Sequence, residues 1–214
     1  MRSFLIMILL AGTASAGDNE VSFGSTTRAL RSSSADAVTG DPLVGGGVGI
    51  GRALGVELPR HFTLWSDAGI TWSGATGSMF TVLATDLFDT TITAGLHLRY
   101  QPIRNVAVSA GVAIGAQHAS LSITDSMDHT ASDTAWGAVA RASTQIDLLA
   151  IDFPRFSFGV RAEFGYLFSQ GIELVPTEER TDDADTLHIP MSEASLGHLD
   201  LGGAYFNIGL VSQF

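Results

Sequence analysis

Apolar and polar residues alternate with a period of two along most of this sequence, which is the pattern of a β-strand with two chemically different faces. The alternation is clearest between Phe156 and Phe168. One face there carries Phe156, Phe158, Val160, Ala162, Phe164, Tyr166 and Phe168, and the other carries Ser157, Gly159, Arg161, Glu163 and Gly165. Because the same polarity recurs in other segments, the sequence predicts an all-β fold.

Eight segments follow this pattern, and the first is the weakest. They span residues 21–29, 44–56, 62–72, 91–100, 106–116, 136–148, 156–168 and 204–214. Their number is even, and each is close to the roughly 9–11 residues that a tilted strand needs to cross a bilayer. Arg52 conflicts with the pattern, since a regular second strand places it on the apolar face. We expect either a bulge among the flanking glycines or a different phase there.

The connections between these segments alternate between short and long. Three are tight, at Leu58-Pro59-Arg60, Pro102-Ile103-Arg104 and Phe153-Pro154-Arg155, whereas four longer ones span about 32–42, 73–89, 119–133 and 169–200. Short periplasmic turns and long external loops are typical of outer-membrane barrels. In lipid every backbone N–H and C=O needs a partner, and a closed barrel supplies them all. The sequence therefore predicts an eight-stranded antiparallel up-and-down transmembrane β-barrel with both termini on the periplasmic side.

The N-terminus has the features of a secretory signal peptide. Arg2 precedes an apolar run from Phe4 to Leu10, and Ala14-Ser15-Ala16 forms a small-residue cleavage site before Gly17. The run is too short for a membrane-spanning helix, which needs about 20 apolar residues. We expect residues 1–16 to be the signal peptide and 17–214 to be the barrel domain. The chain has no cysteine, which excludes a lipoprotein anchor, disulfides and thiolate metal sites.

Charge excludes one large class of partners. Without Arg2 the chain has ten basic and 22 acidic residues, a formal charge of −12. Proteins that bind nucleic acid carry basic patches, so no nucleic-acid partner is expected.

The C-terminal segment Phe206-Asn207-Ile208-Gly209-Leu210-Val211-Ser212-Gln213-Phe214 alternates and ends on an aromatic residue. With the signal peptide and the eight strands, it resembles the OmpA/OmpX/OmpW-like group of small outer-membrane barrels. The resemblance implies the outer membrane of a Gram-negative bacterium, with its lipid and lipopolysaccharide as partners. It also implies that Phe214 belongs to the signal read by the barrel-insertion machinery. We expect a monomer without a cofactor.

Charged residues on the polar face of the strands are the main candidate site. Asp67, Arg141, Arg161 and Glu163 are predicted to point inward near mid-barrel, together with Asn207 and Arg28. Counting along the sixth and seventh strands places Arg141 opposite Arg161 or Glu163, with Asp67 in reach of Arg161 across the lumen. An eight-stranded barrel is just wide enough to be filled by side chains, and buried charges must be paired. A structural plug is therefore favoured over a gated polar conduit.

Three further patterns suggest chemistry. His118-Ala119-Ser120 resembles the His-x-Ser pair of lipid A deacylases, with only Asp125, Asp128 and Asp133 downstream as orienting acids. The acidic segment Thr181–Asp185 offers oxygen ligands to Ca²⁺ without the spacing of a dedicated loop, and His188 and His198 form a conceivable metal pair. Met79, Leu83 and Leu87 recur at helical spacing and suggest either an apolar binding patch or packing over the barrel mouth.

These patterns favour a non-enzymatic barrel with a structural or surface-interaction role. A narrow channel for small or hydrophobic solutes is the first alternative, and a lipid A-modifying hydrolase is the second.

Overall fold

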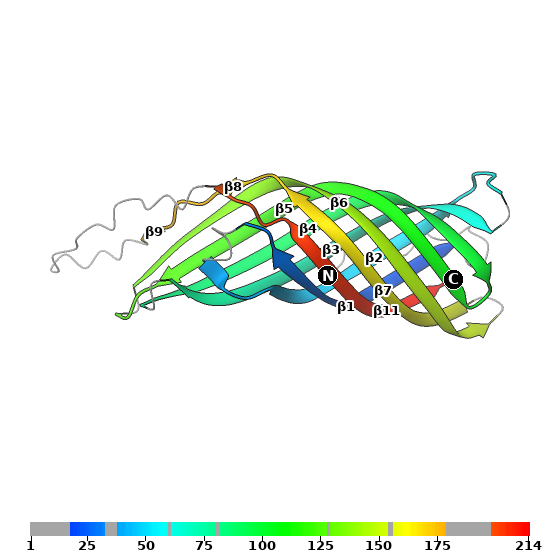
Figure 1. The fold of residues 1–214 in the computed structure, drawn as a ribbon, viewed down its shortest axis with the longest axis horizontal. Helices are drawn as coiled ribbons and strands as arrows, with labels where there is room; N and C mark the ends of the chain where they lie inside the picture. The colour runs from blue at the N-terminus through cyan, green and yellow to red at the C-terminus, as the bar shows by residue number, and fades with distance from the viewer. Residues whose placement is uncertain are drawn as a thin grey trace, which may run out of the picture.

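The computed structural model of the chain is a closed antiparallel β-barrel. It describes residues 18–32, 38–59, 61–79, 82–127, 129–153, 156–178 and 198–214. The eight long strands follow one another in the order β5-β4-β3-β2-β1-β11-β7-β6, and pairing of β5 with β6 closes the cylinder. They run obliquely around the barrel axis (Figure 1). The predicted eight-stranded up-and-down fold is confirmed.

The long strands differ in length. They are β1 (Asn19–Leu30), β2 (Leu43–Leu54), β3 (Phe62–Met79), β4 (Leu83–Ile103), β5 (Val106–Thr124), β6 (Thr130–Phe153), β7 (Phe156–Ser169) and β11 (Gly203–Gln213). The short strands are β8 (Ile172–Glu173), β9 (Thr177–Glu178) and β10 (His198–Leu199). Among the described residues, no helix has the length and apolar character needed to cross a membrane.

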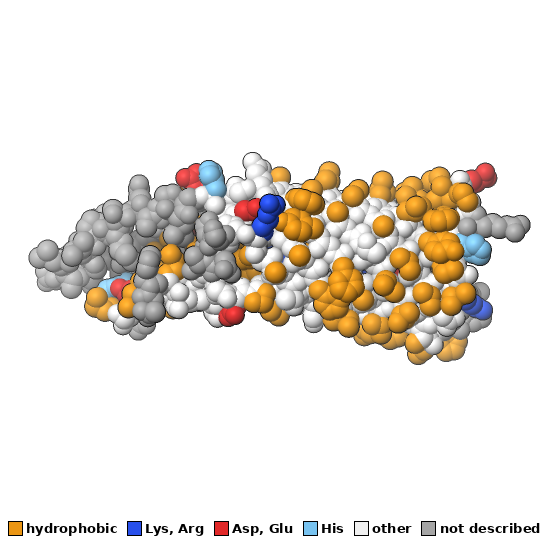
Figure 2. All heavy atoms as spheres, in the orientation of Figure 1, with side chains coloured by type: hydrophobic (Ala, Val, Ile, Leu, Met, Phe, Trp, Pro, Cys, Tyr) orange, Lys and Arg blue, Asp and Glu red, His pale blue; other side chains and the backbone are white. Residues whose placement is uncertain are grey.

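The two faces of the sheet have opposite chemistry. On β5, Val112 and Ile114 point outward and are 66% and 73% exposed, whereas Ala113 between them points inward and is 4% exposed. Hydrophobic side chains form a belt over much of the visible outer surface, and the charged side chains on this face lie mostly toward its two ends (Figure 2). An apolar outer band of this kind is what a barrel presents to lipid.

Two predicted loops are strands instead. Residues 73–79 and 83–89 continue β3 and β4, and residues 119–124 and 130–133 continue β5 and β6. The helical spacing of Met79, Leu83 and Leu87 therefore does not mark a helix, since all three residues lie in strands. A spacing of four residues also keeps side chains on one face of a strand, and Met79 pairs directly with Leu83 across the hairpin.

The longer strands project beyond the rest of the barrel, at the end that carries β8 and β9 (Figure 1). Their inner face is covered by apolar residues from the connecting segments. Buried members of this mouth cluster are Val38, Leu43, Leu87, Ala119, Leu121, Ile123, Ile172, Leu174, Leu199 and Leu201, with Met79 and Leu83 packed against them. Of the two alternatives for Met79, Leu83 and Leu87, packing over the barrel mouth is the one observed.

Arg52 lies in a regular part of β2, without a register shift toward either neighbour. Arg52 is exposed on the outer face, two positions before the strand ends at Leu54. Neither the expected bulge nor a change of phase is present. A long side chain this close to the strand end can extend its guanidinium to the bilayer surface, which removes the conflict. The predicted signal peptide lies outside the described residues.

Candidate functional site

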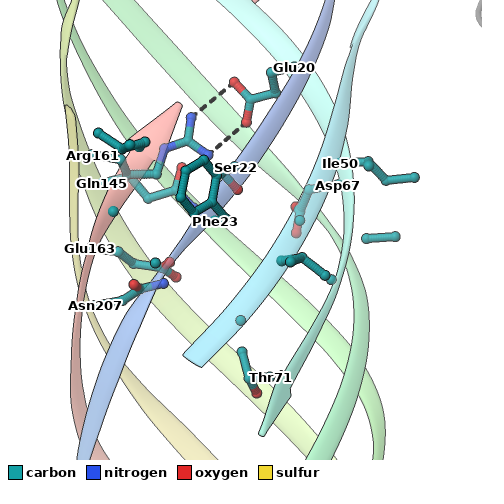
Figure 3. Close-up of a pocket in the computed structure, with 18 of the residues that line it drawn as sticks. Glu20, Ser22, Phe23, Ile50, Asp67, Thr71, Gln145, Arg161, Glu163 and Asn207 are labelled. Atoms are coloured by element: carbon teal, nitrogen blue, oxygen red, sulfur yellow. Dashed lines mark hydrogen bonds and ion pairs between the residues drawn. The ribbon is translucent and has the colours of Figure 1, made fainter. Parts of the chain in front are cut away.

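Four charged side chains form a closed ring near the end of the barrel that carries the short turns. Glu20 on β1, Arg99 on β4, Asp147 on β6 and Arg161 on β7 are all at least 93% buried. Arg161 Nη1 and Nη2 donate to the two Glu20 carboxylate oxygens at 2.8 and 2.9 Å (Figure 3). Arg161 Nε and Nη2 donate to Asp147 at 2.7 and 2.9 Å. This lower ring joins strands that are far apart in the sequence.

Arg99 completes the lower ring from the opposite side. It lies 3.2 Å from Glu20 Oε2 and 3.2 Å from Asp147 Oδ2, and its guanidinium stands 5.2 Å from the Trp65 ring centroid. Two arginines and two carboxylates make the ring neutral. Bidentate pairing and a cation–π contact satisfy charges that would otherwise be very costly to bury.

A middle group lies one level above the ring. Asp67 Oδ1 is 3.3 Å from His97 Nδ1, and Asp67 Oδ2 accepts from Arg141 Nη2 at 3.0 Å. Arg141 Nη1 is 3.6 Å from Glu163 Oε1, which also accepts from the Tyr205 hydroxyl at 2.6 Å. The structure thus brings together three of the four residues singled out from the sequence, Asp67, Arg141 and Glu163.

The predicted register of the sixth and seventh strands is wrong. Arg141 pairs with Leu167, whereas Arg161 pairs with Asp147 and Glu163 with Gln145. The tight turn closes at Phe153 and Phe156, so Arg141 lies farther up the barrel than the sequence count assumed. Arg141 still reaches Glu163 because its side chain is long. Arg161 forms its ion pairs with Glu20 and Asp147 instead of the expected Asp67.

An upper group surrounds Asp89, which is 1% exposed. Asp89 is ion-paired with Arg28, and its Oδ1 accepts from Gln117 Nε2 at 2.6 Å. Gln117 Oε1 in turn accepts from the Ser169 hydroxyl at 2.7 Å. The sequence interpretation missed Asp89 because it assigned the residue to a loop. Its parity with inward Thr91 and Thr93 is the signal that identifies it as an interior residue.

A cavity of about 50 Å³ lies beside the middle group. Glycines have no side chain to fill this space, and the cavity is lined by glycines of β1, β2, β3 and β11, including Gly24, Gly47, Gly49, Gly69 and Gly209. The close-up shows Glu163 and Asn207 on one side of this space and Asp67 on the other (Figure 3). A polar cavity of this volume has room for water and is far too small for an organic solute.

The other chemical candidates are not assembled into sites by the described residues. His118 and Ser120 lie on the outer face of β5, where His118 packs on Trp136 with ring centroids 4.8 Å apart. Asp125 accepts hydrogen bonds within its own turn, and Asp133 accepts from Val175 N at 2.7 Å, so neither orients His118. Asp128, the 181–185 segment and His188 lie outside the described residues. In the part of the chain that is described, no group of three or more potential metal ligands is found.

Closure by antiparallel strands, an apolar outer face and a charged interior together define the transmembrane β-barrel class. No protein-family model matches the chain, and neither does any curated protein. Two crystal structures of Ail, the attachment invasion locus protein of Yersinia pestis, are similar to it. One is Ail itself, with a TM-score of 0.48 and 11% identity, and the other is its complex with the heparin analogue sucrose octasulfate, with 0.47 and 12%. Each match covers 94% of this chain and 100% of the Ail chain.

Proposed function

We propose that this protein is an outer-membrane β-barrel whose interior is closed and whose role is structural or surface-interacting. The observation that carries the proposal is the opposite chemistry of the two faces of each strand. Among the described residues, thirty-three large hydrophobic side chains are exposed, most of them on the outer face of the barrel, whereas five carboxylates and four arginines are ion-paired inside. Exposing so much apolar surface to water is unfavourable, whereas contact with the hydrocarbon of a bilayer is favourable.

The interior supports a closed barrel more than a channel. Three levels of ion pairs span the lumen, and the mouth cluster covers the projecting end with apolar side chains such as Leu121 and Leu199. A solute that entered would have to separate buried ion pairs, which is strongly unfavourable. Reconstitution of the full chain in planar bilayers tests this inference. We expect no steady conductance, and reproducible current steps would favour the narrow channel.

The projecting sheet supports a role at the cell surface. Above His118 and Trp136 the outward residues of β5 and β6 become polar, at Ser120, Ser122, Ser132 and Thr134. An aromatic residue at the edge of an apolar belt marks the membrane–water boundary. The β5–β6 hairpin therefore rises out of the bilayer, where it is available to external partners.

Outer-membrane location and its expected partners have a direct test. Membrane fractionation should recover the protein with lipopolysaccharide, and unheated samples should migrate as folded barrel on electrophoresis. The intact mass should begin at Gly17 if the signal peptide is removed after Ala16. Recovery from the cytosol with Met1 retained would contradict both the location and the cleavage.

A further inference from the structure

A groove crosses the outer face of the barrel where β1, β11 and β7 meet. Ala29 and Ala204 are directly paired across β1 and β11, and their small side chains form its floor. Tyr166 and Phe168 form one wall, with ring centroids 4.7 Å apart, and Arg31 completes the lining. The groove has a volume of about 510 Å³, which is enough for part of an acyl chain.

Arg31 lies just beyond the end of β1, at the level where the apolar belt ends. Its backbone N–H donates to Gly202 O at 3.1 Å, which fixes the residue against β11. The residue is exposed. Its guanidinium has no ion pair or hydrogen bond to the described residues. The four interior arginines, by contrast, are all ion-paired. A guanidinium is well suited to bind phosphate oxygens in a bidentate manner.

A second groove on the outer face provides an internal comparison. It is lined by apolar residues, among them Pro42, Val44 and Phe88, but it also carries the carboxylates Asp41 and Asp86. An anionic head group is repelled by these acids and attracted by Arg31. Charge complementarity therefore distinguishes the two grooves, although both are apolar enough to contact lipid chains.

We propose that the Arg31 groove binds a phosphorylated glycolipid of the outer leaflet. The acyl chain lies over Ala29 and Ala204 beside the Tyr166 and Phe168 rings, and Arg31 binds the phosphate. The inference rests on the proposed outer-membrane location. To that location the inference adds one specific lipid site. Lipid contact without such a site would be uniform around the barrel.

Native mass spectrometry of the refolded full-length barrel in detergent tests the site, with bis-phosphorylated lipid A and its dephosphorylated form as probes. Arg31→Gln should weaken binding of the phosphorylated form by roughly tenfold, as expected for a lost charge-assisted contact, and leave the dephosphorylated form unchanged. Ala29→Trp, which fills the groove, should weaken both. Arg52→Gln removes an outward arginine at the other end of the barrel and should have no effect.

The site would be overturned if Arg31→Gln bound phosphorylated lipid A as tightly as the parent. It would also be overturned if Arg52→Gln weakened this binding as much as Arg31→Gln does. Insertion of the parent into lipid vesicles is measured separately. If the site alone is wrong, insertion remains normal while the Arg31 effect is absent. If the proposed location is wrong, the parent fails to insert at all.

Discussion

Arg161 shows how much of this barrel depends on single interior residues. Its guanidinium contacts Glu20 and Asp147 through four hydrogen bonds, and with Arg99 these residues form a neutral ring that joins four strands. Removing one carboxylate leaves the two arginines of the ring with a single acid between them. The cost of such an uncompensated charge is greater than the net stability that the pair itself provides.

The variant Asp147→Asn tests this ring. It keeps the shape of the side chain and removes the charge shared by Arg99 and Arg161, so we expect a loss of about 3–5 kcal/mol in the free energy of unfolding. Urea unfolding of the refolded barrel measures it. Glu57→Gln is the control, because Glu57 is exposed beyond the end of β2 and should change stability little. Equal urea midpoints for the two variants would contradict the ring's role.

Asp125 makes a second residue-scale prediction, in the turn between β5 and β6. Its carboxylate accepts from the backbone N–H of His129 at 3.0 Å and of Met127 at 2.8 Å. These hydrogen bonds hold the pKa of Asp125 below its ordinary value of 3.8, and the bond from the His129 N–H has the largest effect. The turn is therefore fully stabilised above that value and loses this stabilisation as the pH falls through the lowered pKa. The amide shifts of Met127 and His129 should titrate with a midpoint below 3.8, and a midpoint above it would show that these bonds are absent.

Parity predicted which residues point inward, but it did not predict their partners. Asp67, Arg141, Arg161 and Glu163 are all interior, as the alternation of their strands required. Partner choice depends on strand stagger around the closed barrel, which sets the depth of each side chain. Glu20 was missed because the first predicted strand began at residue 21, whereas β1 begins at Asn19. Its partner Arg161 lies 141 positions away in the sequence.

Among the elements, β2 is the one most dependent on glycine. A Cβ at position 45 would lie 1.9 Å from the Trp72 carbonyl oxygen, which is fixed in the β2–β3 ladder. At position 49 the nearest atom is Ser22 Oγ at 2.9 Å, the end of a side chain that can rotate away. The two glycines therefore have different roles, although the sequence pattern makes them look equivalent.

Alanine at each position separates these roles. Gly45→Ala should destabilise the barrel by about 1–3 kcal/mol, because backbone must move to relieve the overlap. Gly49→Ala should remain within about 0.5 kcal/mol of the parent. Urea midpoints measure both, and a tolerated Gly45→Ala would mean that β2 and β3 pair more loosely than described.

The central parts of the strands were predictable, whereas the upper ends of β3 to β6 were not. Within the bilayer the alternation is strict because one face meets lipid. Beyond it the outward residues turn polar while the inward ones become apolar, as at Ser120 and Leu121. This reversal of polarity made the projecting hairpins resemble loops.

For the whole molecule, closure of the barrel involves the last residue. Phe214 and Asn19 exchange two backbone hydrogen bonds of 3.0 Å across the β1–β11 seam. Deleting Phe214 removes these bonds together with the aromatic ring, whereas Phe214→Ala removes only the ring. If the ring is the assembly signal, both variants should be secreted but fail to accumulate as folded barrel in the outer membrane. Normal assembly of Phe214→Ala would show that the seam, and not a signal, requires this residue.

The central claim is that the strands separate lipid outside from a closed, charged interior. Because the chain has no cysteine, single cysteines can report each face without background labelling. Nitroxide labels at Val112→Cys, Ala113→Cys and Ile114→Cys, in the barrel reconstituted in vesicles, measure exposure to oxygen, which concentrates in lipid. We predict high oxygen accessibility at 112 and 114 and low accessibility at 113. Uniform accessibility at the three positions, or its highest value at 113, would contradict the account.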